Sequence, residues 1–360
     1  IPLRLVGSEM CIRDSTTSAG NVATLNRVIL PVIRRVMPTV IANELVGVQP
    51  MTGPVGQIHT LRVRYSDTAG TGASGASAGE EALSPFKIAE AYSGNTTTGK
   101  ADNTAVLEGA AGNKLSIQIL KQTVEAKTRK LSARWTFESA QDAQSMHGID
   151  VEAEIMAALA QEITAEIDQE VLASLNTLAG SAGQTYDQAA VSGTATFVGD
   201  EHAALAVQIN RVSNQIAQRT RRGAGNWAVV SPFALTILQS ATTSAFARTT
   251  EGSFEAPTNT KMVGTLNNAM KVYVNTYAAD DANVLIGYKG SSESDAAAFY
   301  CPYIPLMSSG VVLDPGTFEP TVSFMTRYGY IELSNTASSL GNAADYLGAV
   351  AITDTNVTFS

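Results

Sequence analysis

Apolar positions recur along this chain with two different spacings, and each spacing predicts a different kind of element. Between Asp150 and Leu178 an apolar residue returns at every fourth position, as is typical of the buried face of one long helix. These positions are Ile155, Leu159, Ile163, Ile167, Val171 and Leu175. Such a helix spans roughly 40 Å at about 1.5 Å per residue. Gly180 and Gly183 predict its end.

Shorter helices follow from the same pattern. Asp200 to Arg219 is predicted as a helix with Asp200 as its N-cap and Gly223 just after its end. Its predicted buried face is Leu205, Ile209, Val212 and Ile216. Pro232 to Ser240 is predicted as a helix that opens with proline. Near the N-terminus, residues 21–30 predict a short helix, which Pro31 kinks and Pro38 ends.

A spacing of two predicts strands. From Ile58 to Ser66, Leu61, Val63 and Tyr65 alternate with arginines, which favours a strand. Further strands are predicted within residues 115–137, 226–231, 271–277, 284–288 and 321–333. Strands and helices alternate without a regular strand–helix–strand period, and there is no internal repeat.

Residues 67–114 differ from the rest of the chain. They are rich in Gly, Ala, Ser and Thr and contain few large apolar residues, so they cannot form a core of their own. A loop of this length is usually functional or a linker. We expect a hairpin-like arm that lies over a neighbouring subunit; the alternative is a flexible linker.

Charge narrows the class of function. The net charge is −9, from 24 Lys and Arg against 33 Asp and Glu, which argues against sequence-independent nucleic-acid binding. Charged residues make up 16% of the chain, against roughly 25% in ordinary soluble domains. Low charge indicates that much of the surface contacts protein. The chain contains no run of about 18 apolar residues, so no membrane span is predicted.

The first fifteen residues are set apart as a probable sequencing-adapter artefact, because Leu5 to Ser15 reads as a translated library adapter. The alternative is a short native leader, which would be a poor signal peptide. Removing these residues leaves Cys301 as the single cysteine. One cysteine excludes an intrachain disulfide framework and fits a reducing compartment. We expect its side chain to be a small buried hydrophobe.

Two short motifs suggest chemistry. Gly94 to Lys100 nearly matches a phosphate-binding P-loop, but Ala101 replaces the hydroxyl residue that would hold Mg²⁺. It also lies in the Gly-rich segment, so a nucleotide-binding enzyme is a remote alternative. Ser77, between Gly75 and Gly79, matches a nucleophile-elbow pattern that composition alone explains.

The remaining candidates predict no site. Glu162, Glu166 and Glu170 form an acidic line on the long helix, for which a solvated or intersubunit face is expected. The histidines fit no zinc spacing: His59, His147 and His202. Residues 221–226 suggest a phosphate nest, but helix termination explains them more simply. We therefore predict no catalytic, cofactor-binding or metal-binding residues, and no enzyme.

Several short motifs occur in the order found in one known family. They are Arg34-Arg35 with Pro38, Gly47-Val48-Gln49-Pro50-Met51, the stretch from Val124 to Ile155, Gly287-Tyr288-Lys289-Gly290, Tyr300 with Pro302-Tyr303, and Thr326-Arg327-Tyr328-Gly329. Their order and spacing, from about Val28 to Leu340, make the resemblance specific. The chain resembles the major capsid (head) proteins of T-even-type, myovirus-like tailed phages, which belong to the HK-97-type capsid family.

The resemblance implies an α+β, HK-97-type phage capsid fold. Its parts would be an N-terminal arm, an extended loop, a peripheral domain with a long spine helix, and an axial domain. The expected bounds are 16–57 for the arm, 58–123 for the extended loop, 124–199 and 311–335 for the peripheral domain, and 200–310 for the axial domain. Residues 336–360 form a C-terminal segment that we leave unassigned.

The resemblance also implies the function of a structural major capsid protein. The subunits would self-assemble into hexameric capsomers of an icosahedral or prolate head that encloses double-stranded DNA without sequence-specific binding. Expected partners are neighbouring capsid subunits, a scaffold, a maturation protease, and vertex and portal proteins, with no membrane. The expected location is the virion, after assembly in the host bacterial cytoplasm. Alternatives are a vertex or other phage structural protein of the same fold, and a cellular compartment shell protein.

Two departures from the family pattern bear on these expectations. The span before Val124 is much shorter than the large inserted domain usual in the family, which argues against an outer insertion domain. The C-terminal stretch keeps Ser339-Leu340-Gly341 but lacks the usual basic finish. The pairing of the terminal strand is therefore left open.

Overall fold

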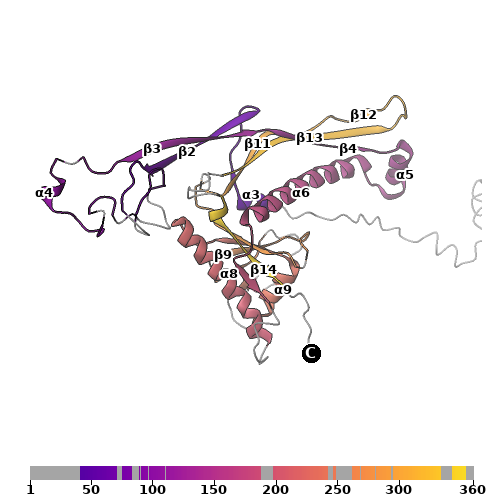
Figure 1. Cartoon of the computed structure of the whole chain (residues 1–360). Coiled ribbons are helices and arrows are strands. Elements are labelled where there is room, and N and C mark those ends of the chain that lie inside the picture. Colours follow the sequence, from indigo (N-terminus) through magenta and orange to yellow (C-terminus); the bar gives the residue numbers. More distant parts are fainter. Residues whose placement is uncertain are drawn as a thin grey trace, which may run out of the picture.

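The computed structural model describes residues 41–70, 75–82, 89, 91–95, 97–109, 111–187, 198–241, 246–248, 262–267, 269–279, 281–292, 295–333 and 343–353. The predicted helix at 21–30 and the rest of the predicted N-terminal arm up to residue 40 lie outside these residues. Figure 1 shows three parts: a long helix under a narrow sheet, a two-stranded arm at one end, and a second sheet with two helices below.

The long helix is α6, Val151–Ala179, and its prediction is confirmed. Asp150 caps it by accepting hydrogen bonds from the amides of Glu152 and Ala153. Gly180 ends it with a positive φ of 66°. The first part of the apolar stripe of α6 faces the narrow sheet, where Leu159 and Ile163 pack against buried sheet residues. Val171 and Leu175, further along the stripe, pack against the second sheet.

The narrow sheet has five strands and lies above α6 (Figure 1). They are β1 (Gly47–Val48), β4 (Lys127–Arg134), β11 (Ala298–Ser308), β12 (Val312–Leu313) and β13 (Pro320–Glu332). β13 is central: it pairs antiparallel with β11, β12 and β4, and β1 pairs parallel with β11. The helices α3 (Ala42–Leu45) and α5 (Phe137–His147) precede β1 and α6.

The second sheet has seven strands in the order β5-β14-β10-β6-β9-β8-β7. Their bounds are β5 (Gln184–Tyr186), β6 (Trp227–Val230), β7 (Phe246–Arg248), β8 (Met262–Leu266), β9 (Met270–Val274), β10 (Val284–Gly287) and β14 (Leu347–Ile352). One face packs on α8 (Val198–Thr220) and α9 (Pro232–Ser240). The other face packs on α3, the end of α6 and the 3₁₀ helix η2 (Ala343–Tyr346).

Alternation within the buried strand β6 explains how one sheet serves two cores. Ala228 and Val230 belong to the cluster with α8 and α9, whereas Trp227 and Val229 belong to the cluster with α6. Successive side chains of a strand point to opposite faces, so each strand contributes to both layers. The two folded parts therefore share a continuous apolar contact at the end of α6.

The arm consists of β2 (Val55–Tyr65) and β3 (Leu115–Glu125), which pair antiparallel from Val55↔Glu125 to Tyr65↔Leu115. The predicted strand at 58–66 is thereby confirmed. The described residues between the two strands form the far end of the arm, with the one-turn helix α4 (Thr104–Leu107). The predicted hairpin-like arm is present in this chain; its contact with a neighbour stays a prediction.

The two sheets do not divide the chain at the bounds that the resemblance implies, and the domain bounds themselves stay a prediction. β11 lies in the narrow sheet with β13, although residues 200–310 were expected to be axial. β5 and β14 lie in the seven-stranded sheet, although β5 falls within 124–199 and β14 within the unassigned segment. Long-range strand pairing decides these memberships, and local periodicity carries no information about it.

The two ends of α8 also differ from expectation. The helix begins at Val198, so Asp200 lies within it rather than at its cap. The left-handed residue after its end is Arg221, with φ of 53°, rather than Gly223. Gly223 instead lies against the ring of Tyr288, where an added Cβ would come within 2.6 Å of a ring carbon. Close packing, not backbone conformation, accounts for this glycine.

Candidate functional site

The outer half of the arm has one apolar face and one polar face. Residues directly opposite each other in an antiparallel pair lie on the same face, so the register groups six apolar side chains together. They are Leu61, Val63, Tyr65, Leu115, Ile117 and Ile119. Leu61, Ile117 and Ile119 are 65%, 69% and 66% exposed. We call these six residues the apolar arm face.

The opposite face of the arm is polar. Arg62 and Arg64 lie opposite Gln118 and Ser116 there. Arg62 is almost fully buried and forms an ion pair of 2.5 Å with Glu81, which folds back from the far end of the arm. The outer half of the arm therefore presents its apolar residues in one direction, which is typical of a surface that contacts protein.

The far end of the arm is folded on itself. The rings of Tyr65 and Tyr92 lie 4.5 Å apart, and the Tyr92 hydroxyl donates to the carbonyl of Lys114. The Lys114 amide donates to Asp67 at 2.8 Å. These contacts join residues from both strands to the intervening loop. The described part of the Gly-rich segment is thus tied into the arm, unlike the linker alternative.

A second group of exposed apolar side chains lies at the opposite end of the narrow sheet. It comprises Phe137, Met146, Met307, Val312, Leu313 and Phe318. Phe318 is 69% exposed and has a positive φ of 57°, which is unusual for a bulky residue. Its ring lies 5.6 Å from that of Phe137. We call this group the tip; in Figure 1 it lies to the right of the arm, near β12 and α5.

The base of the arm packs against β11 of the narrow sheet; we call this contact region the joint. Val124 of β3 is buried with Phe299 and Cys301 of β11. A Cβ on Gly329 would lie 2.5 Å from a Val124 methyl group, so the strand can approach only glycine at this point. Burial raises the pKa of the Cys301 thiol, which fits the predicted role as a buried hydrophobe.

Three of the motifs that carry the family resemblance contact one another here, namely those that contain Gly47, Lys289 and Tyr300. Gly47 and Val48 pair with Phe299 and Tyr300, and the Lys289 ammonium donates to the Val46 carbonyl at 2.9 Å. Segments far apart in sequence are thereby fixed together. Their shared structural role explains why short motifs recur there without any catalytic pattern.

The acidic line on α6 holds the helix to the sheet. Arg129 of β4 places its two terminal nitrogens on Glu166, at 2.6 Å, and on Glu170. The Tyr328 hydroxyl of β13 also donates to Glu170 at 2.6 Å. Two members of the line are therefore intrachain partners. Their side chains are still 45% and 41% exposed, so the expected solvated face is confirmed, whereas their pairing with Arg129 was not predicted. We call Arg129, Glu166, Glu170 and Tyr328 the clamp; Glu162 lies outside it.

These contacts shift the pKa values of the clamp. Burial alone would raise the pKa of Glu170, but hydrogen bonds from Arg129 and Tyr328 outweigh it and lower the pKa below 4.5. Burial and the bond to Glu170 raise the pKa of Tyr328 to about 12. At neutral pH, Glu170 is therefore charged and Tyr328 is neutral. In these states both groups bind their partners, and the clamp holds the helix in place.

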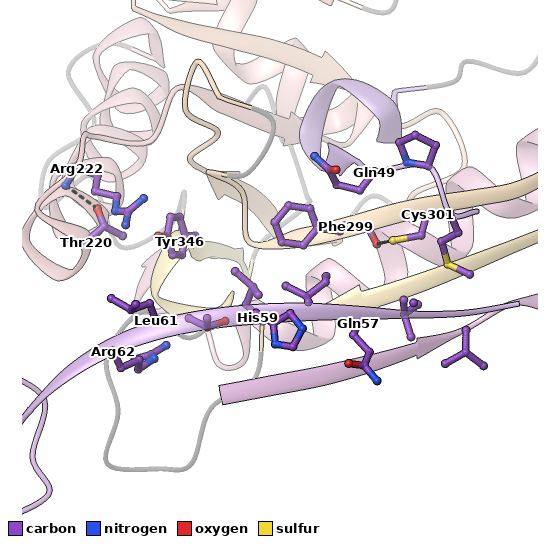
Figure 2. A pocket seen from close by; sticks show the side chains of 18 of the residues that line it. Gln49, Gln57, His59, Leu61, Arg62, Thr220, Arg222, Phe299, Cys301 and Tyr346 are labelled. Atoms are coloured by element: carbon purple, nitrogen blue, oxygen red, sulfur yellow. Dashed lines mark hydrogen bonds between the residues drawn. The ribbon is translucent and has the colours of Figure 1, made fainter. Parts of the chain in front are cut away.

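An open cavity of about 820 Å³ lies beside the base of the arm. Figure 2 shows β2 crossing it with Gln57, His59 and Arg62. Phe299 and Cys301 approach from β11, Arg222 from the turn after α8, and Tyr346 from the end of η2. Two of its arginines are paired, Arg62 with Glu81 and Arg222 with Asp295 at 2.6 Å. No metal-binding group of three His, Cys, Asp or Glu occurs in the described residues.

The sequence candidates for chemistry do not form a site in the described residues. In the near-P-loop, the amides of Thr97 and Thr98 donate to the Asn95 side chain. The Asn95 amide donates to the Lys100 carbonyl, which closes a turn. Residues 91–93 before it form turn and bend rather than strand. A P-loop needs free amides after a buried strand, so this geometry does not support nucleotide binding.

Ser77 lies in another turn, where its amide donates to Glu80 at 3.1 Å. Of the possible bases, His202 is buried in α8 and shares a hydrogen bond with Ser240 of α9. The side chain of His147 lies outside the described part of the chain. His59 lies on β2 opposite Lys121. The described histidines therefore stand apart from Ser77 and from each other.

The sequence has clear relatives. The family described as "Major capsid protein Gp23" matches residues 22–352. The major capsid protein of Vibrio phage KVP40 is 30% identical over 417 residues, covering 91% of this chain and 80% of that protein. The major capsid protein of Enterobacteria phage T4 is 29% identical over 400 residues, covering 87% and 76%.

Solved structures show the same fold. A chain from Mycobacterium phage Adephagia has a TM-score of 0.55 at 14% identity, covering 96% of this chain and 100% of that one. A chain in the capsid of Myoviridae phage XM1 has a TM-score of 0.54 at 11% identity, covering 94% and 99%. The predicted α+β, HK-97-type capsid fold is confirmed. The chain belongs to the Gp23 family of phage major capsid proteins.

Proposed function

We propose that this chain is the structural subunit of a tailed-phage head. It assembles into hexameric capsomers, and these tile an icosahedral or prolate shell around double-stranded DNA. The single observation that carries the proposal is the apolar arm face, together with membership of the family. An arm that projects from the fold and exposes isoleucines in one direction is built to contact another subunit.

The apolar arm face takes a second copy of the chain. A two-stranded ribbon is marginal in water by itself, and burying one Leu or Ile side chain stabilises by about 1.5–3 kcal/mol. The arm and the tip lie at opposite ends of the molecule (Figure 1), so a contact that joins unlike ends is heterologous. Such contacts generate a ring when the rotation between successive copies closes, and many modest contacts add up in a shell.

Within this proposal, each sheet and the arm correspond to one part of the HK-97-type capsid fold. The seven-stranded sheet with α8 and α9 is the axial domain, around the capsomer centre. The five-stranded sheet with α6 is the peripheral domain, with α6 as its spine helix. β2 and β3 form the extended loop. These assignments move β11 to the peripheral domain, and β5 and β14 to the axial domain, relative to the bounds predicted from sequence.

Further partners follow from resemblance to the family. We infer a scaffold, a maturation protease, a vertex protein and a portal, and a site of assembly in the host bacterial cytoplasm. The subunit has no enzymatic role in this proposal. The structural character of the family and the closed turn at Asn95 support this part of the proposal. Within the described residues, no helix is long and apolar enough to cross a membrane.

The test is assembly of purified full-length chain, measured by light scattering and negative-stain imaging. The chain should form hexamers, sheets, tubes or shells. Ile119→Glu places a charge on the apolar arm face and should reduce assembly at least about tenfold, because a carboxylate would have to be buried against the neighbour. Circular dichroism should report an unchanged fold, since this side chain is already exposed.

The matched control is Gln118→Glu, one residue away on the polar face and also exposed. It adds the same charge to the same strand and should assemble like the unmodified chain. Equal assembly by both variants would show that the apolar arm face is not the contact. A chain that stays monomeric at every concentration would contradict assembly by this protein alone.

A further inference from the structure

An apolar groove of about 180 Å³ lies between α6 and the outer edge of the narrow sheet. Its apolar walls are Ile163, Ile167, Ile304, Pro305 and Leu306. Ile163 is buried beneath it, whereas Pro305 and Leu306 are exposed at its rim. The groove lies on the opposite side of the joint from the apolar arm face, so the proposed arm contact does not account for it.

The chain enters the described fold at this groove. The amides of Ile41 and Ala42 both donate to one oxygen of Asp168, at 3.0 and 2.6 Å. Asp168 is 1% exposed and lines the groove together with Ala42 and Asn43. A buried carboxylate that holds two consecutive amides fixes the position of the backbone. Whatever precedes Ile41 therefore leaves from the end of the groove.

The sheet edge beside the groove is open in the described residues. The residues that follow β1 bond to β11 as far as Pro302, where the Met51 amide donates to the carbonyl. Beyond that point, Leu306 and Met307 are exposed on the same strand. An exposed apolar edge strand is usually covered, because otherwise it pairs with other chains.

The sequence that leads into Ile41 has the composition to cover this edge. Residues 28–40 contain eight apolar residues and two prolines, and their only charged residues are Arg34 and Arg35. Thirteen residues span from roughly 20 Å, if helical as predicted up to Pro38, to roughly 45 Å, if fully extended. Both lengths exceed the α6 wall of the groove, which runs from Ile163 to Asp168. We propose that residues 28–40 of the same chain run along the open edge of β11, and that one or two of their apolar side chains fill the groove against Ile304 and Leu306.

The same chain is the favoured source because it needs no linker. Its residue 40 is bonded to Ile41, which Asp168 holds at the groove. The effective concentration of a directly attached segment reaches the millimolar range, so a segment from a second copy competes poorly in dilute solution. The proposal concerns the unassembled subunit and does not depend on the proposed function.

Trypsin tests the proposal, because Arg34 and Arg35 are its cleavage sites within the segment. The unassembled full-length chain is isolated by size exclusion, and cleavage at these arginines is followed by mass spectrometry. A synthetic peptide of residues 22–42 gives the unprotected rate. We expect cleavage in the chain to be at least about tenfold slower than in the peptide, since proteolysis tracks the population of the open form.

Leu306→Glu places a charge at the rim of the groove and should speed cleavage at Arg34 and Arg35 about tenfold, by loss of apolar contact. Leu313→Glu is the matched control: its leucine is similarly exposed, at 44% against 38%, on the same sheet but outside the groove. It should leave the rate unchanged. Slow cleavage elsewhere in the chain reports an intact fold, and Leu306→Ala gives a milder version of the same change.

Three outcomes would overturn the proposal. The first is cleavage of the unmodified chain at the peptide's rate. The second is equal protection in Leu306→Glu, Leu306→Ala and the unmodified chain. The third is protection that disappears on dilution as light scattering falls to the monomer mass, which would assign the groove to a second copy. Failure of shell assembly affects none of these measurements.

Discussion

At the scale of single residues, charged groups in this subunit connect elements that are distant in sequence. The guanidinium of Arg129 joins β4 to Glu166 and Glu170 of α6, and Tyr328 of β13 completes the clamp. A planar guanidinium suits this task because its nitrogens can bind two carboxylates in a fixed geometry. The charge of each clamp member should therefore affect how firmly α6 is held.

Glu170→Gln should lower the melting temperature at pH 7 and have a smaller effect in acid. The folded pKa of Glu170 is lowered, so its contribution is present above pH 4.5 and is lost as the pH falls through the folded pKa. The side chain is 41% exposed, and screening by solvent limits the effect to about 1 kcal/mol or less. Thermal unfolding between pH 7 and pH 3 measures it.

Glu162→Gln is the control, since this exposed carboxylate lies on the same helix outside the clamp. It should change the melting temperature little at any pH. A gap between Glu170→Gln and the unmodified chain that stayed constant down to pH 3 would show that the clamp does not act through the Glu170 charge.

Asp168→Ala should destabilise the subunit where the chain enters the fold. The change removes the acceptor of the Ile41 and Ala42 amides, which are themselves buried. A buried donor without a partner costs about 1–3 kcal/mol. Thermal unfolding gives the cost, and hydrogen exchange at residues 41 and 42 locates it. Exchange as slow as in the unmodified chain would refute this assignment. Asp168→Asn keeps an oxygen acceptor and should lose less.

At the scale of elements, strong apolar periodicity predicted the long helices correctly. The pairing of strands distant in sequence did not follow from periodicity. The stripes of α6 and α8 gave helices close to their observed bounds, because an apolar face must pack on something wherever the helix lies. β11 was missed as a strand: Pro302 and Pro305 disfavour one. They are tolerated because the strand is at an edge beyond β1.

The short helix α5 was also missed. Its sequence is polar and lacks an apolar stripe, and its signals are the Thr136 cap and the left-handed Gly148 that follows. Its existence depends on these caps and on packing against the start of α6. Such helices follow from tertiary context more than from pattern.

Glycines at strand contacts give a test at this scale. A Cβ on Gly287 of β10 would lie 2.1 Å from the ring of Trp227, a buried residue of β6. Gly287→Ala should therefore destabilise the second sheet by about 1–3 kcal/mol through overpacking, as measured by urea unfolding. Gly183→Ala is the control, since its Cβ would meet only a side-chain oxygen at 3.6 Å. Equal stability of the two variants would refute the packing argument.

At the scale of the whole molecule, exposed apolar groups lie at its two ends and the cores lie between them. The apolar arm face and the tip are separated by the length of the narrow sheet (Figure 1). The low charge predicted that much of the surface contacts protein, but only the fold shows that the exposed apolar groups lie at opposite ends.

Assembly should therefore respond to salt as an apolar process. Sodium sulfate strengthens apolar burial, whereas screening weakens contacts between exposed charges. Assembly of the full-length chain, followed by light scattering, should increase with sulfate and change little between about 0.1 and 1 M sodium chloride. A steep loss of assembly with sodium chloride would show that charge pairs dominate the contact.

The sequence by itself determined the family, the class of fold, the long helix and the absence of a recognisable catalytic pattern. These depend on local spacing and on the order of short motifs, both of which are properties of the chain alone. Only the tertiary structure decided which sheet owns β11 and β14, that Glu166 and Glu170 face Arg129, and that six arm residues share one face. The physical reason is that strand register and long-range ion pairs depend on segments that meet only after folding.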